Sequence, residues 1–408
     1  MDGHGDESLG TLPATETKQF HWKWWHTVGS VVVVLLVAAL IASLISIPYY
    51  AITPGTAQSV ERLIGVPSRY QHSHNGQVEL VDVELTPLRA IEWPWFELDP
   101  NAQIVSSQDL LGPANAQQYQ IQGELDMSNA QQAATVVALR RLGYPVQVRR
   151  TGALVYSLFP GSPAARSLSV GQVIVGIDSH AVTSESELGK WIAGAKAGGS
   201  VSLRVLTYPA HTARSVSVQL SEWRIEGTGS QAQLVCPIWG TQTKLPLYKA
   251  SASSGAPSGP TKCIGVSLEQ NYAVGKLPFR VDLSSEGIIG PSAGLAFTLG
   301  LMQRLDPYDL TGGHKVAATG TMSIDGRVGD VGGVAQKTVA VRDSGASVFF
   351  VPPQEYKVAL AHAGGSLKVY AVSTVDQALH ILETSYGGRL PAAAAAVVAA
   401  GTGGSKSG

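Results

Sequence analysis

One serine in the C-terminal third of the chain has the surroundings of an acyl-transfer nucleophile. Ser292 lies in Gly-Pro-Ser-Ala-Gly (290–294), which precedes a stretch with the hydrophobic periodicity of a helix. The proline suits the first helical position, and the small neighbours let a substrate backbone approach closely. Backbone N–H groups at such a helix start can stabilise an oxyanion. We therefore predict that Ser292 is a nucleophile and that the N–H groups of Ser292 and Ala293 form an oxyanion hole.

A serine hydroxyl also needs a base that removes its proton, and Lys337 is the leading candidate. It follows a strand, an Asp325-Gly326 turn and a glycine-rich loop, and it falls in the first turns of a predicted helix. Its neighbours are apolar, and burial lowers a lysine pKa from ~10.4 towards the ~7–8 at which the amine can accept a proton. Alternative bases are Lys315, which we expect to face solvent, and three histidines outside any triad-like motif: His314, His362 and His380.

Near the N-terminus, residues 28–47 form an uncharged apolar stretch with tryptophans before it and tyrosines after it. At 1.5 Å per residue this stretch is about 30 Å long, which matches a bilayer core. It predicts one transmembrane helix, with a cleaved signal peptide or a buried helix as alternatives. Lys18 and Lys23 precede the stretch, so we expect a cytoplasmic N-terminus and the remaining chain outside the cytoplasm, at the plasma membrane.

Composition excludes some classes of function. The 29 basic and 30 acidic residues nearly balance, and charged residues make up only 14% of the chain, so we expect no nucleic-acid partner. Neither Cys-x-x-Cys nor His-Glu-x-x-His occurs, so we expect no metal site. The two cysteines, Cys236 and Cys263, form either a disulfide or two free thiols.

The middle of the chain, from about 143 to 221, alternates short strands with one helical stretch near 185–195. Phe159-Pro-Gly-Ser-Pro-Ala-Ala and Gly171-Gln-Val-Ile-Val-Gly-Ile-Asp resemble PDZ domains of bacterial proteases. The resemblance implies a domain that accepts an extended peptide as an added strand. By position the peptide would be captured at Leu142, Gly143 and Tyr144, although Pro145 offers no N–H group. A PDZ fold that serves only as a spacer is the alternative.

The motifs around Ser292 and Lys337, together with Ala-Thr-Gly-Thr-Met-Ser-Ile-Asp-Gly-Arg-Val, resemble the proteolytic domain of Lon proteases in order and spacing. The resemblance implies a Ser–Lys dyad that hydrolyses polypeptides without a cofactor, with Thr319 as a hydroxyl that helps orient the dyad. It also implies a ring-shaped homo-oligomer, a hexamer.

The chain departs from the Lon pattern in three ways. Ile289 stands where an acidic residue usually precedes Gly-Pro-Ser, and Thr321 stands where a glutamate follows the Thr-Gly pair. The chain also has no Gly-x-x-x-x-Gly-Lys-Ser/Thr, so ATP-driven unfolding is not expected.

Taken together, the sequence predicts an α+β multi-domain protein that resembles bacterial membrane-anchored, PDZ-containing Lon-like proteases. A catalytically inactive, membrane-anchored PDZ scaffold is the competing hypothesis. The expected parts are a disordered cytoplasmic N-terminus (1–27), the transmembrane helix (28–47), a connecting region (48–127), the PDZ-like domain with an opening helix at 128–142 (128–221), an exposed Gly/Ser/Pro-rich insertion (222–261), the Lon-like α/β proteolytic domain (262–385) and a low-complexity tail (386–408).

Overall fold

The computed structural model describes residues 24–112, 116–196, 198–207, 212–226, 233–237 and 262–391. Most of three predicted parts lie outside these residues, namely the N-terminus before Trp24, the insertion at 222–261 and the tail after Pro391.

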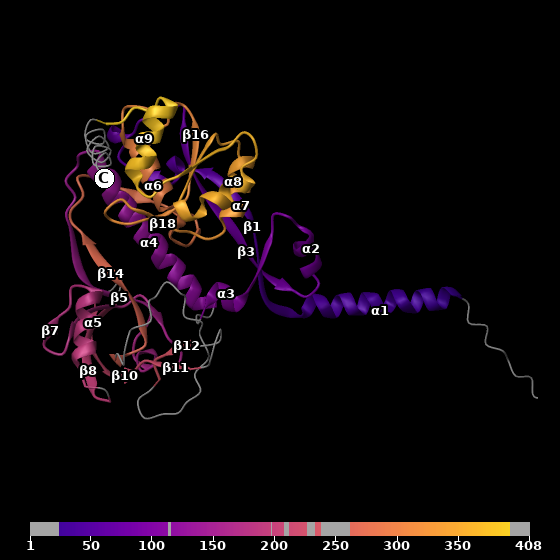
Figure 1. The fold of residues 1–408 in the computed structure, drawn as a ribbon, viewed down its shortest axis with the longest axis horizontal. Coiled ribbons are helices and arrows are strands. Elements are labelled where there is room, and N and C mark those ends of the chain that lie inside the picture. The colour runs from indigo at the N-terminus through magenta and orange to yellow at the C-terminus, as the bar shows by residue number, and fades with distance from the viewer. Residues whose placement is uncertain are drawn as a thin grey trace, which may run out of the picture.

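The chain opens with a long apolar helix, α1 (Trp24–Leu44), none of whose side chains is buried. Figure 1 shows α1 projecting away from the folded body. By length and composition it could cross a membrane, since 21 residues extend about 31 Å. The helix ends before the predicted limit at residue 47, because Ser46 already begins strand β1 (Ser46–Ser59) and Pro48 cannot continue a helix interior.

A six-stranded mixed sheet forms the centre of the C-terminal domain, in the order β20-β19-β16-β3-β1-β4. Its other strands are β3 (Gln77–Arg89), β4 (Gln103–Ser106), β16 (Lys315–Ala318), β19 (Val348–Val351) and β20 (Lys368–Ala371). β1, β3 and β4 lie almost entirely in the region predicted from the sequence to be a connecting unit (48–127), but they are strands of this central sheet. β3 pairs in parallel with β16, far along the chain, and β1 pairs antiparallel with β3.

Helices cover both faces of this sheet. α4 (Ala116–Arg141), α6 (Gly294–Leu305) and α9 (Val375–Tyr386) pack on one face, and α7 (Val334–Asp343) and α8 (Tyr356–His362) on the other. Adjacent residues of β3 point to opposite faces of the sheet. Leu80 packs in the core on the side of α4, α6 and α9, and Val81 packs in the core on the side of α7 and α8.

Helix α4 differs from its predicted place in the PDZ-like domain. It begins well before residue 128, and its buried side chains, from Met127 to Leu139, pack in the core beneath the six-stranded sheet, beside α6. The helix was visible in the sequence, but its packing partner was not, because an apolar stripe does not specify which domain covers it.

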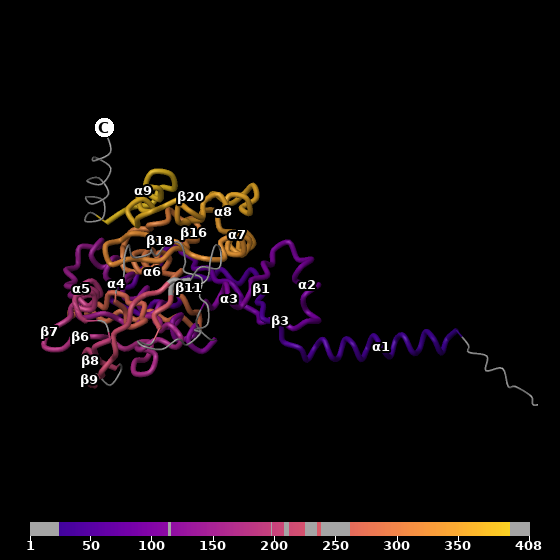
Figure 2. The backbone as a smooth tube through the Cα atoms, turned by 60° about the horizontal axis from the view of Figure 1, so that its bottom comes forward, coloured from indigo at the N-terminus to yellow at the C-terminus, as the bar shows by residue number. Residues whose placement is uncertain are grey.

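The PDZ-like domain is a separate sheet with the order β14-β5-β6-β8-β9 and its own apolar core. Its elements are β5 (Val148–Leu158), β6 (Val173–Ile177), β7 (His180–Ala181), α5 (Glu185–Gly194), β8 (Ser200–Thr207), β9 (Thr212–Gln219) and β14 (Val266–Val274). The edge strand β14 was expected in the proteolytic domain. It instead pairs antiparallel with β5 along its whole length, after the insertion brings the chain back to the sheet. Figure 2 shows this domain and the catalytic domain side by side, both on the same side of α1.

Short elements complete the described fold. The short helices are η1 (Val60–Leu63), η2 (Ser68–Tyr70), α2 (Trp93–Leu98), α3 (Ser107–Leu111), η3 (Ala164–Arg166), η5 (Pro291–Ala293) and η6 (Pro353–Glu355). The paired short strands are β2 (Ile64–Gly65) with β15 (Asp282–Leu283), β10 (Ser221–Glu222) with β13 (Lys262–Cys263), β11 (Arg224–Glu226) with β12 (Gln233–Val235), and β17 (Thr321–Met322) with β18 (Val328–Gly329).

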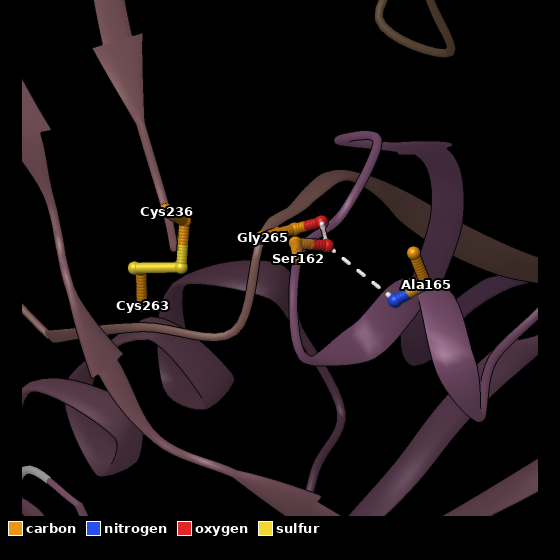
Figure 3. The surroundings of a disulfide bond; sticks show 5 residues. All are labelled: Ser162, Ala165, Cys236, Cys263 and Gly265. Carbon is orange, nitrogen blue, oxygen red and sulfur yellow. Dashed lines mark hydrogen bonds between the residues drawn. A yellow bond between two sulfur atoms is a disulfide. The ribbon is translucent and has the colours of Figure 1, made fainter. Parts of the chain in front are cut away.

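Cys236 and Cys263 form a disulfide with their Cα atoms 6.1 Å apart, which settles the two alternatives left by the sequence (Figure 3). The bond lies beside the turn that leads into β14. There Gly265 approaches Ser162 so closely that a side chain at 265 would collide with it. The Ser162 hydroxyl donates a 3.0 Å hydrogen bond to the Gly265 carbonyl (Figure 3). The disulfide thus ties the segment after β12 to β13, just before β14 joins the PDZ-like sheet.

Replacing both cysteines with serine should loosen this sheet. The disulfide closes a loop of 27 residues, for which chain entropy predicts about 3 kcal/mol of stabilisation. Amide hydrogen exchange in β5 should therefore become about 100-fold faster, while exchange in α6 stays the same. Unchanged exchange in β5 would show that the disulfide does not hold the sheet together.

Candidate active site

Ser292 lies where the chain enters α6. Gly290 has a φ of 92°, which favours glycine, and Pro291 opens the short helix η5 that continues into α6. The next turn packs tightly, because a Cβ atom at Gly294 would lie 2.7 Å from the Met322 backbone nitrogen. Ser292 is half-buried and Ala293 is buried beneath it. The predicted helix start is thus present, and glycine is required on both sides of the serine.

Lys337 lies in the first turns of α7, as predicted, with only 3% of its surface exposed. Burial lowers its pKa from 10.5 to about 8, although the carboxylates of Asp82 and Glu355 act in the opposite direction. The Lys337 Nζ donates a 3.3 Å hydrogen bond to the Thr319 hydroxyl. The amine is therefore fixed in place and has a pKa near the range of a general base.

Thr319 connects the lysine to the nucleophile segment. Its hydroxyl accepts from Lys337 and donates a 3.3 Å hydrogen bond to the Ser292 carbonyl. That carbonyl also accepts from the Gly320 N–H at 2.9 Å. No direct hydrogen bond joins the Ser292 hydroxyl to the Lys337 amine within the described part of the chain. The geometry thus brings the three predicted residues together, with Thr319 as the link between the other two.

Ser292 and Lys337 line the same cavity, which has a volume of about 860 Å³. Apolar side chains of β1, β3, α3 and the nucleophile loop form part of its wall: Ile52, Val83, Leu85, Leu110, Leu111, Ile288 and Ile289. The acidic residues that line it are Asp82, Asp126, Glu286 and Asp330, and Lys337 is its one basic residue among those described. The cavity is large enough for a segment of several residues, because pockets of this size hold drug-sized ligands.

Helix α4 holds the loop that precedes Ser292, the predicted nucleophile. The Gly123 carbonyl accepts a 2.8 Å hydrogen bond from the Gly290 N–H. The side chain of Ile289 packs directly on the Gly123 backbone, where a Cβ atom would come within 2.8 Å of it. Ile289 stands where Lon proteases usually have an acidic residue, and here it serves as a packing contact. Gly123 is not among the residues predicted from the sequence, where its one signal is a lone glycine inside a long helical stretch.

The PDZ-like sheet contacts the same helix. The Tyr156 hydroxyl donates to Asp126 at 2.9 Å, and the Gln122 side chain donates to the Tyr156 carbonyl at 3.0 Å. Burial raises the pKa of Asp126. Burial, together with the nearby Asp126 charge, raises the pKa of Glu269 on β14 to about 7. Tyr156 and Asp126 both line the cavity, so the PDZ-like domain forms part of its wall.

The remaining predicted residues lie elsewhere. Leu142 and Tyr144 are half-buried against the catalytic core, where Tyr144 meets Phe279 edge-on at 5.3 Å, and Gly143 ends α4 with a φ of 85°. Lys315 was expected to face solvent but pairs with the buried Glu79 at 3.2 Å. Lys315 does not line the cavity, and neither do the three histidines proposed as alternative bases, His314, His362 and His380.

Two segments of the chain match known domain families. Residues 285–384 match the family model of the Lon protease (S16) C-terminal proteolytic domain, and residues 140–220 match that of the PDZ domain. The chain therefore carries a Lon-type proteolytic domain and a PDZ domain. The catalytic sheet also includes β1 and β3, and the PDZ sheet includes β14, all of which lie outside the matched residues.

Three Lon proteases are similar to part of this chain. Lon protease 2 of Bacillus subtilis (strain 168) is 35% identical over 92 residues, 22% of this chain and 16% of that protein. Lon protease of Malacoplasma penetrans is 35% identical over 83 residues, which are 20% of this chain and 10% of that protein. Lon protease of Campylobacter concisus is 31% identical over 94 residues, which are 22% of this chain and 11% of that protein. These matches support a serine peptidase, although they cover only a small part of the relatives' own lengths.

A solved structure is similar to the PDZ segment. The PDZ domain of the SdrC-like protein of Listeria monocytogenes is 27% identical, covers 17% of this chain and 72% of its own, and gives a TM-score of 0.16. The PDZ assignment therefore rests on the family match and on the strand order.

Gly123→Ala should impair the site without unfolding the protein. The methyl group would displace Ile289 and, through Gly290, the nucleophile, so we expect kcat/KM to fall between about 10- and 100-fold. The higher helix propensity of alanine should offset the strain, so that the free energy of unfolding changes by less than about 1 kcal/mol.

The matched control is Gly189→Ala in α5, where an added Cβ atom meets nothing within 4 Å. This variant should be slightly stabilised and fully active. Full activity of Gly123→Ala would show that α4 does not position the nucleophile loop.

Proposed function

We propose that this protein is an ATP-independent serine endopeptidase with a Ser292–Lys337 dyad, anchored in the plasma membrane by α1. The observation that carries the proposal is the buried Lys337 amine, which shares a cavity with Ser292 and is joined to the nucleophile segment through Thr319. Burying an amine destabilises its charged form, which is the change that a lysine base requires.

In this mechanism the neutral Lys337 amine takes the proton of Ser292 as the hydroxyl attacks the substrate carbonyl. The N–H groups of Ser292 and Ala293 stabilise the oxyanion, and each such donor typically contributes ~3 kcal/mol. Collapse of the intermediate expels the amine product, which takes the proton from Lys337. Water, activated by the same lysine, then hydrolyses the acyl-enzyme. Thr319 acts as a positioning residue that holds the lysine amine.

The substrates we propose are extracytoplasmic or membrane-proximal polypeptides. Tyr50 lines the cavity and lies six residues after Leu44, so the cavity wall is at most about 20 Å of extended chain from the end of α1. The disulfide supports an oxidising compartment, and Lys18 and Lys23 support a cytoplasmic N-terminus. By resemblance to Lon-type domains, the active form we propose is a hexamer.

The PDZ domain is proposed to select these substrates. The sequence suggested capture at Leu142, Gly143 and Tyr144, but Leu142 and Tyr144 pack against the catalytic core. The edge of β14 offers an alternative, because β14 pairs with β5 alone among the described strands and α5 lies beside it. A peptide could add to this edge by backbone hydrogen bonds. β14 carries Glu269, whose pKa is raised by burial and by the nearby charge of Asp126, and Asp126 lines the cavity, so a peptide captured on β14 would lie near the cavity.

The dyad can be tested by labelling and by the pH dependence of activity. A serine-reactive acylating probe should modify Ser292 in the folded wild type, located by peptide mass spectrometry. Ser292→Ala and Lys337→Met should each lower kcat/KM at least about 1,000-fold. Because the base must be neutral, kcat/KM should rise with pH up to about 8 and then level off.

The competing hypothesis is an inactive PDZ scaffold, which predicts a folded wild type with neither labelling nor cleavage. Substantial cleavage by Lys337→Met would refute the dyad but not the peptidase. Intact folding of each variant is checked by hydrogen exchange in α6 and α7.

The peptide edge of β14 can be tested with single prolines at Glu269 and at Gln270 in the inactive Ser292→Ala chain. Adjacent strand residues point their N–H groups in opposite directions, so one of the two prolines removes a donor from the free edge and the other removes one from the pairing with β5. The variant that keeps its PDZ fold should bind a C-terminal peptide at least about 10-fold more weakly in fluorescence anisotropy. Equal affinity would place peptide capture elsewhere.

A further inference from the structure

The short helix α2 (Trp93–Leu98) begins directly beside the end of α1. Two hydrogen bonds fix this placement: the Ile91 N–H donates to the Ala42 carbonyl at 3.3 Å and the Ala90 N–H to the Ile45 carbonyl at 3.0 Å. The last carbonyls of a helix have no partner within it, so residues 90 and 91 help to satisfy the end of α1. The start of α2 is therefore level with the final turn of α1.

Large apolar side chains of α2 are exposed. Trp95 is 75% exposed and Leu98 80%, in a helix with no buried residue. Trp93 packs edge-on against Tyr49 of β1 with ring centroids 4.9 Å apart. A folded domain rarely exposes adjacent large apolar side chains without a partner for them.

Both views of the molecule place α2 on the side from which α1 projects. In Figures 1 and 2 α2 is the part of the folded body beside the C-terminal end of α1, and the catalytic and PDZ domains extend in the other direction. If α1 spans the bilayer, the boundary between hydrocarbon and headgroups lies at the level where α2 begins.

We propose that α2 is a second membrane contact, in which Trp95 and Leu98 insert into the interface of the bilayer that α1 crosses. Tryptophan favours this zone because its ring is apolar and its N–H can reach water or headgroups. The proposal rests on the membrane anchoring proposed above for α1.

Charge indicates which lipid property drives the contact. Arg89 is the one basic residue from 89 to 99, against three acidic residues: Glu92, Glu97 and Asp99. The segment therefore has no electrostatic attraction to anionic headgroups, and burial of its apolar surface drives the contact. The contact should form on zwitterionic phosphatidylcholine and should not depend on anionic lipid.

The contact has a consequence for the active site. A single spanning helix leaves the body free to tilt and rotate, whereas a second attachment point sets its orientation. α2 leads through β4 into α3, whose residues Leu110 and Leu111 line the cavity, and β4 pairs with β1. The segment that contacts the membrane, α2, is thus continuous with one wall of the cavity. This connection holds that wall close to the bilayer surface.

The test uses the full-length chain in phosphatidylcholine vesicles with a polarity-sensitive fluorophore on one introduced thiol. The two native cysteines form a disulfide, so Leu98→Cys and, separately, Trp95→Cys each carry a unique free thiol. The matched control is Trp191→Cys in α5, where the native side chain is also exposed but lies in the PDZ domain, away from α1. Both α2 labels should be quenched at least about twofold more by brominated lipid than the control, and less by aqueous iodide. Added phosphatidylglycerol should leave this difference unchanged.

Each outcome decides a different point. Labels at 95 and 98 that are as accessible to iodide as the control, in protein that floats with vesicles, would overturn the α2 contact and leave the anchor intact. Failure to float would overturn the anchor and the α2 contact together. Quenching that appears only with phosphatidylglycerol would overturn the apolar mechanism proposed here. Cleavage of a soluble peptide is measured separately, and its loss would concern the dyad alone.

Discussion

Burial of the Lys337 amine requires two things from the surrounding fold: close packing that excludes water and a fixed polar partner for the nitrogen. The packing comes from α7 against the central sheet, and the partner is Thr319, which follows strand β16. The same threonine hydroxyl bonds the Ser292 carbonyl at the start of α6. An amine buried without such a partner would destabilise the fold by several kcal/mol. The sheet, α6 and α7 must therefore be positioned together, and this common constraint brings a serine and a lysine from distant segments into one cavity.

Helix α4 extends this constraint to the rest of the molecule. One part of the helix packs in the catalytic core, and a hydrogen bond from Gly290 reaches its backbone at Gly123. The PDZ-like sheet contacts the helix through the hydrogen bond from Tyr156 to Asp126, and Asp126 lies about one turn from Gly123. A change in the docking of the PDZ domain would therefore act on the same helix that supports the nucleophile loop. Rigid helices transmit such displacements because packed interfaces deform little.

The apolar helix α1 is joined to the candidate site just as directly. α1 passes within one residue into β1, which lies between β3 and β4 in the central sheet and carries Tyr50 and Ile52 to the cavity wall. Because only one residue separates α1 from the sheet, the orientation of α1 and the orientation of the cavity are linked. With α1 in a membrane, as proposed, such a short connection favours substrates that are themselves near the membrane surface.

The sequence by itself determined the local parts: the apolar helix near the N-terminus, the helix start at Ser292, the placement of Lys337 in a helix and the strand and turn signals of the PDZ segment. These depend on neighbouring residues, whose periodicity, caps and turn types are visible in order along the chain. Family resemblance added Thr319, which no local pattern singles out. Only the tertiary structure decided that β1 and β3 belong to the catalytic sheet, that β14 completes the PDZ sheet and that Gly123 supports Ile289 and Gly290. These are pairings between residues far apart in the chain, and a strand or an apolar stripe carries no local mark of the partner that will cover it.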